Sequence, residues 1–370
     1  MTQKESNRNK IIRSLGKLKR IILEDRDPHK RLDHLKKLIF TKLNLAEDRI
    51  ATMEGKWRSF DRHRAANYDT FKLLTYYIDK EFTVEQKKWF IEKQFYRALG
   101  YFPQLDNPSS FNEKTQWYKL NYRDPLMTDL IDKYRFKEKV SELIGPQYVV
   151  PLLGVWDRGA DIDFDSLPKE FALKSNWGSG SRHVILVKDK DALDLDQVRY
   201  KTSNWMQPWE NVYYHTFDWG YKDIKPKIIA EKLIKNKLLE YKFFCFNGEP
   251  KYFYVAEDSS PGSRNSHTYF DMDWNRLPFV RHAKPTDKHL ERPANFDEMV
   301  QLSRTLSKKF PHVRVDLCQT ETGLIVEELT FYVGSGTGRF TPREWDFKFG
   351  EAFDLPASNL HEYEKHLEQD

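Results

Sequence analysis

The stretch from His312 to Gly338 constrains the fold more than any other part of this 370-residue chain. Two runs of alternating apolar and polar residues flank Glu321-Thr322-Gly323. This pattern predicts a β-hairpin with a three-residue loop and glycine in the left-handed position. Because side chains alternate along a strand, one face should be apolar and turn toward a core. The residues expected on that face are Val313, Val315, Leu317, Ile325 and Leu329.

The other face of the hairpin carries charge. The predicted loop places Asp316 opposite Glu328, and Arg314 opposite Thr330. Two carboxylates about 5 Å apart across a sheet repel each other. A Mg²⁺ ion between them would remove the conflict, because Mg²⁺ binds one or two carboxylates together with phosphate oxygens. The alternative is an ordinary edge hairpin whose acids face water.

Two glycine-containing segments could bind an anion through backbone N–H groups. Phe171–Lys174 is a predicted strand, and His183–Val187 is a predicted return strand. Between them Gly178-Ser179-Gly180 could fold over phosphates, with Lys174 adding a positive charge. A plain hairpin turn is the alternative, and a Walker A motif is absent from the sequence. The second segment, Gly334-Ser335-Gly336, follows the charged hairpin.

Length and composition set broad limits. The chain is long enough for two or three domains, and its net charge is +5. Cys245 and Cys318 are its only cysteines and both fall in predicted strands, which excludes a disulfide framework. There is neither an apolar run long enough to span a bilayer nor the apolar core of a signal peptide. We therefore expect a cytoplasmic protein.

The first 45 residues are rich in Lys and Arg and predict helix. One interpretation is a basic helix in peripheral contact with an anionic membrane surface, at the inner face of the membrane. The other is a solvated helical arm packed on its own domain. Nucleic acid is not an expected partner, because no nucleic-acid motif accompanies the charge. Residues 46–98 continue as predicted helix, and no feature indicates an oligomeric state.

The middle of the chain shows three further signals. Ser110 and Glu113 have the spacing of a capping box, which predicts a helix from Phe111 to about Asn121. A second helix is predicted from Pro125 to about Gly145, with Lys133 inside it. Ile228–Ile234 predicts a buried strand followed by a linker. An adenine could lie against that linker, with Glu231 reading its edge, or Glu231 could simply end a surface strand.

Taken in order, these segments resemble ATP-grasp enzymes, and specifically the TupA-like branch linked to bacterial surface polysaccharides. The resemblance runs from about Leu99 to Leu355. The segments that carry it are FNEKTQWYKL (111–120), DPLMTDLIDKY (124–134), PLLGVWD (151–157), FALKSNWGSG (171–180), AEKLI (230–234), EYKFFCFNG (240–248), FPHVRVDL (310–317) and EELTFYVGSG (327–336). Two positions depart from the branch: Trp177 stands where His is usual, and Tyr332-Val333 replaces Thr-Pro.

The resemblance implies an α+β ATP-grasp fold in which two α+β lobes clasp ATP, preceded by a helical N-terminal region. We expect five parts. They are a basic helical region (1–98), a helical lead-in (99–150), a small lobe with the phosphate loop (151–234), a large lobe with the Mg/ATP hairpin (235–356) and a tail (357–370).

The resemblance also implies roles for particular residues. The ATP phosphates would contact Lys133, Lys174, Lys242, Gly178, Ser179 and Gly180. Adenine would be read by Glu231, Lys232 and Leu233. The Mg²⁺ ligands would be Asp316, Glu328 and Thr330. Charge on the reacting acyl group would be stabilised by Arg314, and by the N–H groups of Gly334, Ser335 and Gly336. Lys174 and Arg314 would be the catalytic pair.

The activity implied is carbon–nitrogen ligation with ATP and Mg²⁺ as cofactors. A carboxylate would be activated as an acyl phosphate and then attacked by an amine. The resemblance indicates an amino acid or similar amine and a uronic-acid-type carboxylate of a surface polysaccharide or its precursor. Two alternatives stay open: an ATP-dependent glycan phosphotransferase, and a non-catalytic basic module that binds membrane or anionic glycan.

Overall fold

The structure is a computed structural model that describes residues 76, 79, 83–180, 182–234, 237–257 and 266–360. The chain divides into two compact units, Met1–Phe82 and Thr83–Asp370, and the account below concerns the second. The basic arm predicted for residues 1–45, most of the helix predicted for 46–98 and the end of the tail lie outside the described residues. Within the described part, no helix is long and apolar enough to cross a bilayer.

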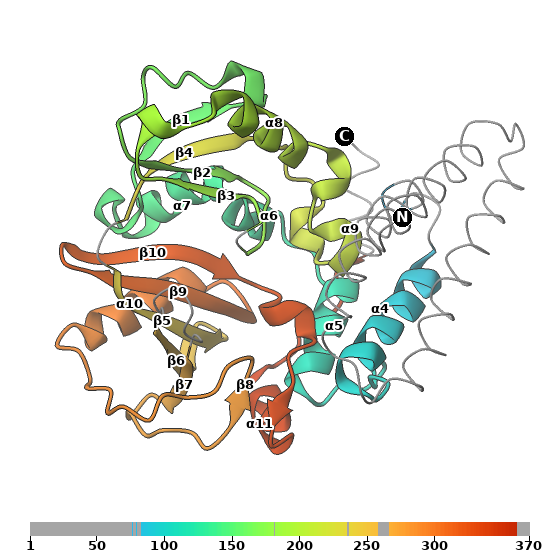
Figure 1. Cartoon of the computed structure of the whole chain (residues 1–370). Coiled ribbons are helices and arrows are strands. Elements are labelled where there is room, and N and C mark those ends of the chain that lie inside the picture. Colours follow the sequence, from blue (N-terminus) through green and yellow to red (C-terminus); the bar gives the residue numbers. More distant parts are fainter. Residues whose placement is uncertain are drawn as a thin grey trace, which may run out of the picture. The chain divides into compact units, whose positions relative to one another are not determined.

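Two separate antiparallel sheets form the frame of this unit (Figure 1). The first has the order β1-β4-β2-β3 and consists of β1 (Leu152–Trp156), β2 (Phe171–Ser175), β3 (Val184–Val187) and β4 (Ile228–Lys232). Its apolar side chains pack with Val198 and Trp205 of α8 (Leu195–Trp205) in a small core of their own. We call this part the small lobe.

The second sheet has the order β10-β9-β5-β6-β7. Its strands are β5 (Lys237–Phe246), β6 (Glu249–Glu257), β7 (Ser266–Asp271), β9 (His312–Thr320) and β10 (Gly323–Thr330). Helix α10 (Phe296–Ser307) packs on one face, where Phe296 meets Phe243 at a ring distance of 5.8 Å. The opposite face meets α11 (Glu344–Ala352), where Phe349 lies 5.1 Å from Phe244. We call this part the large lobe.

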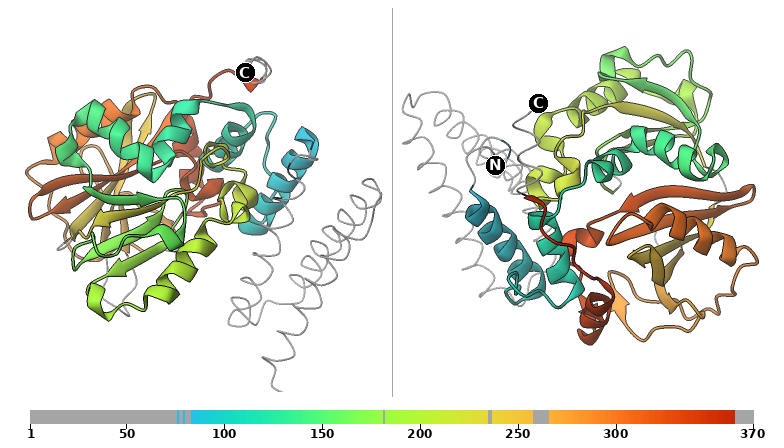
Figure 2. Two further views of the ribbon diagram at one scale, coloured as in Figure 1. Left: turned by 90° about the horizontal axis from the view of Figure 1, so that it is seen from above. Right: turned by 180° about the vertical axis from the view of Figure 1, so that it is seen from behind.

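The remaining elements connect the two lobes or border them. The helices are α4 (Val84–Leu99), α5 (Phe111–Asn121), α6 (Pro125–Ile131), α7 (Lys133–Ile144) and α9 (Tyr213–Thr216), and a short ladder joins β8 (Val280–Arg281) to β11 (Phe340–Thr341). Single 3₁₀ turns are η3 (Pro146–Tyr148), η4 (Gly159–Asp161), η5 (Lys190–Ala192), η6 (Pro208–Glu210) and η7 (Trp219–Tyr221). The segment η8 (Val333–Gly336) is a tight turn that contains left-handed residues. Helices α6 and α7 lie between the two sheets (Figures 1 and 2), and their apolar residues join the larger core.

The capping box predicted at Ser110 is confirmed. Ser110 Oγ accepts a hydrogen bond from Glu113 N, and Glu113 Oε2 accepts one from Ser110 N. The buried Glu113 carboxylate also accepts from the N–H groups of Gln104 and Ser109. One side chain therefore fixes the start of α5 and the loop that leads into it.

The single helix predicted from Pro125 to Gly145 is wrong. The chain breaks at Asp132, whose backbone is extended and whose carboxylate accepts hydrogen bonds from Tyr134 N and Arg135 N. An Asp in this role starts a new helix, because it satisfies N–H groups that have no partner inside the helix. Lys133 consequently stands at the first position of α7 and not in the middle of a helix.

The β9–β10 hairpin is confirmed, but its loop is shorter than predicted. Glu321 and Thr322 alone form the turn, and Gly323 pairs with Thr320. The register then shifts between Val326 and Glu328, so that one extra residue on β10 forms a β-bulge. The shorter turn shifts the register by one residue and the bulge shifts it back by one. Glu328 therefore lies opposite Asp316, as predicted.

The same two changes alter the core face of β10. Leu324 and Val326 are buried, whereas Ile325, which we expected in the core, is only partly buried. The other apolar residues predicted for that face are buried: Val313, Val315, Leu317 and Leu329. Beyond the bulge the alternation therefore returns to the predicted phase.

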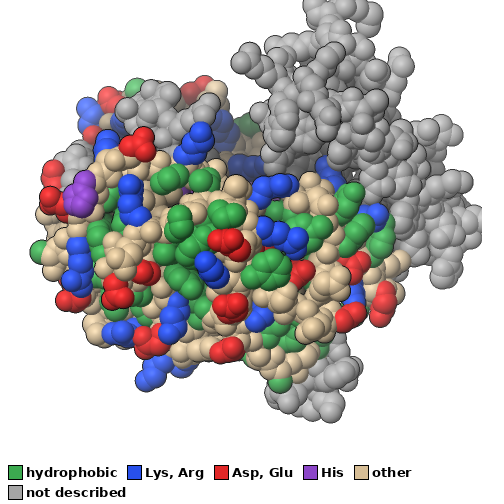
Figure 3. All heavy atoms as spheres, turned by 90° about the horizontal axis from the view of Figure 1, so that it is seen from below, with side chains coloured by type: hydrophobic (Ala, Val, Ile, Leu, Met, Phe, Trp, Pro, Cys, Tyr) green, Lys and Arg blue, Asp and Glu red, His purple; other side chains and the backbone are tan. Residues whose placement is uncertain are grey.

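The face of the molecule seen in Figure 3 carries Lys and Arg side chains interspersed with Asp and Glu side chains. Charges of opposite sign lie side by side across its described part. The described part of this face is therefore of mixed charge.

Candidate functional site

Asp316 is the centre of a buried polar network on the large-lobe sheet. Its side chain is fully buried. Arg314 donates two hydrogen bonds to it, from Nε to Oδ1 at 2.6 Å and from Nη2 to Oδ2 at 2.7 Å. Lys242 Nζ donates to Oδ2 at 2.9 Å from the neighbouring strand β5. Burial raises the pKa of Asp316, but Arg314 and Lys242 outweigh it, so the pKa falls below its usual value. Asp316 is therefore a carboxylate whose charge the protein already balances.

Glu328 faces Asp316 across the hairpin but has a different environment. Its side chain is 46% exposed. Its Oε1 atom lies 3.5 Å from Arg314 Nη2 and accepts from Thr330 Oγ1 at 3.2 Å. Arg314 Nη2 also donates to Thr330 Oγ1 at 3.1 Å. The repulsion expected between the two acids is thus relieved by the guanidinium of Arg314.

Glu328 and Thr330 line a hollow together with residues from α6, α7 and the small lobe. Lys133 and Ser179 line the same hollow. Its other lining residues are Leu130, Ile131, Phe136, Tyr221, Glu327 and Leu329. Two of the predicted phosphate-contacting residues therefore share this hollow with two of the predicted metal ligands. The other predicted residues are not among its lining: Lys174, Lys242, Gly178, Gly180 and Asp316.

The loop after β2 approaches α7 closely. Lys133 Nζ donates to Gly178 O at 2.5 Å, and Lys133 N donates to Asn176 O at 3.0 Å. A Cβ atom on Gly178 would lie 2.7 Å from His183 Cβ and 2.8 Å from Ser175 Oγ, so only glycine fits. Gly180 has a φ of +66° and no atom near its Cβ position, which is typical of an exposed turn. Burial lowers the pKa of Lys133, and Glu328 opposes that effect.

Lys174 pairs with Glu231, the residue predicted to read adenine. Lys174 Nζ lies 2.5 Å from Glu231 Oε2, and Lys137 Nζ lies 2.8 Å from Oε1. Lys137 also donates to Val150 O at 2.7 Å. Burial raises the pKa of Glu231, but the two lysines overcome it and hold the pKa below its usual value. Both carboxylate oxygens of Glu231 are therefore occupied by lysines.

Sequence reasoning missed Lys137. It follows Lys133 by one helical turn, so both lysines lie on one face of α7. That spacing was the signal that could have found it. Of the adenine contacts predicted next to Glu231, the Lys232 N–H is already used, because it donates to Pro151 O at 3.0 Å. Leu233 follows β4 and is partly buried.

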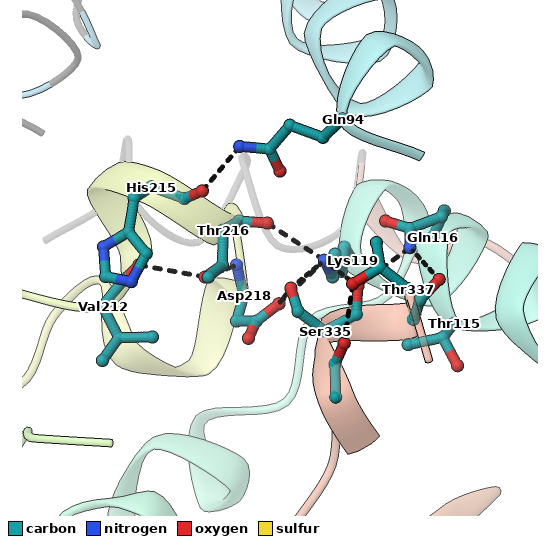
Figure 4. Close-up of polar contacts among 12 residues, drawn as sticks. Gln94, Thr115, Gln116, Lys119, Val212, His215, Thr216, Asp218, Ser335 and Thr337 are labelled. Atoms are coloured by element: carbon teal, nitrogen blue, oxygen red, sulfur yellow. Dashed lines mark hydrogen bonds and ion pairs between the residues drawn. The ribbon is translucent and has the colours of Figure 1, made fainter. Parts of the chain in front are cut away.

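The Gly334-Ser335-Gly336 segment lies in a second polar cluster (Figure 4). Ser335 sits between Lys119 of α5 and Asp218, which pair at 2.9 Å. Lys119 Nζ donates to Ser335 Oγ at 2.6 Å, and Ser335 Oγ donates to Asp218 Oδ1 at 2.9 Å. Gln116 Nε2 donates to Ser335 O and Gly336 O. The segment is thus anchored through its side chain and carbonyl groups.

The expectation of a free N–H group at Ser335 is wrong, because Ser335 N donates to Tyr332 O at 2.7 Å. All three residues of the segment have left-handed φ angles, +59° at Gly334, +53° at Ser335 and +63° at Gly336. A Cβ atom on Gly336 would lie 2.4 Å from Gln116 Nε2. The close packing against α5 therefore accounts for Gly336 without an anion.

The two departures from the branch pattern have structural explanations. Trp177 is buried and its indole N–H donates to Trp205 O at 3.0 Å. Nearby, His183 Nδ1 lies 2.8 Å from Ser175 Oγ and its ring stacks on Trp205. Tyr332 and Val333 are both buried in the larger core. The altered positions therefore pack against the protein interior.

The chain matches the TupA-like ATP-grasp family over residues 113–354, well over half of its length. The protein belongs to the TupA-like ATP-grasp family. Its fold is the α+β ATP-grasp fold, and the two sheets described above form the small and large lobes of that fold. Comparison with curated proteins gave no match.

Several solved ligase structures are similar to parts of this ATP-grasp protein. They include D-alanine–D-alanine ligase from Bacillus anthracis (TM-score 0.33, 20% identity, 55% of this chain and 57% of that chain). Biotin carboxylase from Campylobacter jejuni gives a TM-score of 0.35 with 14% identity over 62% of this chain and 47% of that chain. D-alanine–D-alanine ligase from Helicobacter pylori gives 0.36 with 13% identity over 65% and 67%. The chain thus spans little more than half the length of the first relatives it matches.

The oxygen donors of the hairpin fit Mg²⁺ only if other ligands join them. The described residues contain no group of three or more His, Cys, Asp or Glu side chains that could hold a metal. Glu328 is half exposed and can bind an ion, while Asp316 Oδ1 retains a lone pair beside its bond to Arg314. Mg²⁺ characteristically combines one or two carboxylates with phosphate oxygens and water. The set therefore suits a magnesium nucleotide better than a bare ion.

Proposed function

We propose that this TupA-like ATP-grasp protein is an ATP-dependent carboxylate–amine ligase that works through an acyl phosphate. The supporting observation is the shared hollow. Lys133 of α7, Ser179 of the β2–β3 loop and Glu328 of β10 line it together, although they come from three distant parts of the chain. Cations and a glycine loop on one side and oxygen donors on the other are the groups that a magnesium nucleotide requires.

ATP would lie with its phosphates in this hollow. Lys133 would offset phosphate charge and hold the loop carbonyl of Gly178 in place. Lys174, paired with Glu231, would reach the phosphates from β2. Glu328, Asp316 and Thr330 would hold Mg²⁺, which supplies charge neutralisation during phosphoryl transfer. Adenine would lie toward Glu231, Lys232 and Leu233, where backbone groups beyond β4 can read its edge.

Arg314 would stabilise negative charge on the reacting acyl group. Its guanidinium lies between Asp316 and Thr330, next to Glu328, so a carboxylate bound at this end of the hairpin meets a fixed positive charge. Such a preorganised donor stabilises the oxyanion formed when an amine attacks the acyl carbon, an effect on the order of 3 kcal/mol. In the first step the carboxylate and ATP would give an acyl phosphate and ADP. In the second step the amine would displace phosphate from the acyl carbon and form the amide. Lys242 would keep Asp316 ionised throughout.

For the substrates we propose an amino acid or similar amine and a sugar acid of a bacterial surface polysaccharide or its precursor, joined in the cytoplasm. The support is family membership alone. The test is a screen in which the purified protein receives Mg²⁺-ATP with uronic acids and amino acids, followed by ADP detection and mass analysis of products. An amide product with ADP would support the ligase. ADP with a phosphorylated glycan would replace it with a phosphotransferase.

Glu328→Gln is the matched test of the metal site. Glu328 is half exposed, so the fold should tolerate the loss of its charge. We expect turnover to fall by at least a hundredfold while the circular dichroism spectrum and melting temperature stay near those of the wild type. Glu321→Gln, in the exposed turn of the same hairpin, is the control and should leave turnover unchanged. Normal turnover in a folded Glu328→Gln protein would contradict the assigned role.

A further inference from the structure

A row of paired residues crosses all five strands of the large-lobe sheet. In register, Glu328 of β10 pairs with Asp316 of β9, Asp316 with Lys242 of β5, Lys242 with Tyr254 of β6, and Tyr254 with Tyr269 of β7. Residues paired in register lie on the same face of a sheet. One end of the row is the proposed nucleotide site. The other end, at Tyr269, has no role in the reaction described so far.

Arg281 of β8 lies beside that far end. Its side chain is 1% exposed and rests on the rings of Phe340 and Phe111, at 4.9 and 5.8 Å. Nη2 donates to Val333 O at 3.1 Å, whereas Nε is buried without a hydrogen-bond partner. Within the described part of the chain, Arg281 forms no ion pair. A buried guanidinium without a direct ion pair is a costly arrangement.

Two further buried polar atoms near Arg281 have no partner: Tyr269 Oη and His267 Nδ1. The ring of Tyr254 lies 4.9 Å from Tyr269 and 4.6 Å from His267, and Arg314 lies 5.9 Å from the same Tyr254 ring. Burial raises the pKa of Tyr269, and the nearby Arg281 opposes it. The unpartnered atoms therefore gather around one aromatic group that also borders Arg314.

The acids of this region make their closest contacts with groups other than Arg281. Asp316, the buried acid of the row, is already matched by Arg314 and Lys242. Asp346, another buried acid near Arg281, accepts hydrogen bonds from Asn112 N and Nδ2. No carboxylate lies within ion-pair distance of Arg281 in the described part of the chain, although the charge of Asp346 opposes the effect of burial on the Arg281 pKa. Its guanidinium fork matches the two oxygens of a carboxylate, with which it forms paired, charge-assisted hydrogen bonds.

We propose that Arg281 and Tyr269 form a subsite for a carboxylate group of a substrate, at the β7 end of the row. Asp316 and Tyr269 are three strands apart, or about 14 Å at the usual strand spacing. The carboxylate held by Arg281 is therefore a different group from the one that reacts beside Arg314. It belongs either to the amino acid, as its α-carboxylate, or to a second acidic sugar. The inference rests on the proposed function in taking the ligand to be a substrate of the ligase.

Glycines cover Arg281 on the side of the η8 segment. A Cβ atom on Gly338 would lie 2.6 Å from Arg281 Nη2, and one on Gly334 would lie 3.3 Å from it. Gly334 also borders His282 Nε2, and His282 is exposed. Because Arg281 is 1% exposed, a ligand would have to displace the His282 side chain or part of the η8 segment to reach the guanidinium.

Binding can be tested without ATP, by thermal denaturation of the full chain at constant ionic strength. The probes are the twenty amino acids, glucuronate and galacturonate, each compared with an uncharged counterpart such as alaninamide or glucose. We expect at least one carboxylate to raise the melting temperature saturably, and its uncharged counterpart to have no effect. A response to amino acids alone would assign the subsite to the amine substrate, and a response to sugar acids alone would assign it to the acceptor. No response to any carboxylate beyond that to chloride would overturn the subsite.

Variants separate this subsite from a structural role of Arg281. Tyr269→Phe removes only a hydroxyl that has no partner, so the free protein should melt at the same or a higher temperature. It should nevertheless bind the responding carboxylate at least threefold more weakly, and Arg281→Lys at least tenfold more weakly. Ser303→Ala removes another buried, unpartnered hydroxyl on α10 and should not change binding. Unchanged binding in both Tyr269→Phe and Arg281→Lys would overturn the proposal.

The two proposals can fail separately. If carboxylate binding depends on Arg281 but no ADP is released with any substrate pair, the subsite stands and the ligase does not. If the wild type makes an amide and Tyr269→Phe and Arg281→Lys leave every KM unchanged, the ligase stands and the subsite does not.

Discussion

Asp316 illustrates how a single buried residue can obscure its own function in a mutagenesis experiment. Its carboxylate is fully buried between Arg314 and Lys242, while that of Glu328 is half exposed. Substituting Asp316 removes the fully buried counter-charge of both cations. Lys242 then keeps Glu240 at 3.0 Å and Arg314 keeps Glu328 at 3.5 Å, and both of these acids are more exposed than Asp316. Loss of activity in an Asp316 variant could therefore arise from instability.

We expect Asp316→Asn to lower the free energy of unfolding by about 3–5 kcal/mol, the usual cost of removing one partner of a buried ion pair. Urea unfolding at neutral pH measures the loss. Asp316→Asn combined with Lys242→Met should recover part of the loss, since one of the two cations that lost its buried partner is then removed. A loss below about 1 kcal/mol would contradict the network described here.

His312 predicts a pH dependence. Its ring is fully buried among Phe111, Phe246 and Phe353, and Nδ1 donates to Cys245 O at 2.9 Å. Burial lowers the pKa of His312 to about 3 from an ordinary value of 6.5. The unfolded chain therefore binds the proton more tightly than the folded chain between these two values. Stability from this group is complete above pH 6.5 and decreases as the pH falls toward 3.

Between pH 7 and pH 5, His312 should lower the free energy of unfolding by about 2 kcal/mol. Urea unfolding at both values gives the difference for the wild type. His312→Gln should reduce that difference by about the same amount, whatever its effect on stability at pH 7. An identical pH dependence in the two proteins would exclude the assignment.

At the residue scale, strand alternation was sufficient to place Arg314, Asp316, Glu328 and Thr330 on one face, because alternation is a local property of the backbone. It could not show that Arg314 would bind Asp316 itself. That pairing depends on side-chain rotamers and on Lys242, which β5 brings in from 74 residues away. The buried polar atoms around Arg281 that lack hydrogen-bond partners could not be predicted from local sequence either, because their positions depend on which strands become neighbours.

At the scale of elements, helix α7 organises the small-lobe side of the hollow. Lys133 at its first position holds the glycine loop, and Lys137 one turn later holds Glu231. Glu231 in turn pairs with Lys174. Lys137 is therefore expected to act on the nucleotide through Lys174 and not by touching it.

We expect Lys137→Met to raise the KM for ATP about tenfold with a smaller effect on kcat. Without Lys137, the negative charge of Glu231 is balanced by Lys174 alone, which leaves Lys174 less available to the phosphates. Steady-state kinetics with varied ATP measures both constants. Lys139→Met is the control on the same helix, since Lys139 pairs with the exposed Glu142. Equal KM values in Lys137→Met and the wild type would show that Lys137 only stabilises the fold.

Elements with strong local signals were predictable from the sequence. The capping box at Ser110 and the apolar alternation of β9 each depend on residues a few positions apart. The break at Asp132 was missed, although Asp followed by helix-forming residues is a recognised cap. The bulge in β10 had no local signal, because it depends on how β10 pairs with β9.

At the scale of the whole unit, the Lys119–Asp218–Ser335 cluster joins three distant segments. Lys119 belongs to α5, Asp218 follows α9, and Ser335 lies in η8. Lys119 and Asp218 are both buried, and Lys119 also donates to Thr216 O. Burial lowers the pKa of Lys119 and raises that of Asp218, while each group opposes the shift of the other. The cluster therefore depends on both charges being present.

We expect Lys119→Met or Asp218→Asn alone to reduce the free energy of unfolding by about 3–5 kcal/mol. The double variant should lose clearly less than the sum of the two single losses, with a coupling of about 1–3 kcal/mol. Urea unfolding of the four proteins provides the cycle. Strictly additive losses would mean that the two side chains stabilise the protein independently.

The fold of the whole unit was predictable through resemblance, because several long segments appear in the family's order. The physical patterns alone suggested hairpins and helices but not their arrangement. The function of Gly334-Ser335-Gly336 shows the limit. Three small residues predicted open backbone, whereas α5 and Asp218 fill the space around them.

The bulge in β10 affects any alignment of this chain with a hairpin that has a three-residue turn and no bulge. A turn shortened by one residue and a strand lengthened by one residue offset each other, so an alignment without gaps still brings Glu328 into the correct column. The four positions between the turn and the bulge, 323–326, are then assigned to the wrong face of the strand. Any substitution inferred for Leu324, Ile325 or Val326 from such an alignment would exchange interior and exterior, while the acidic residues would look correctly matched.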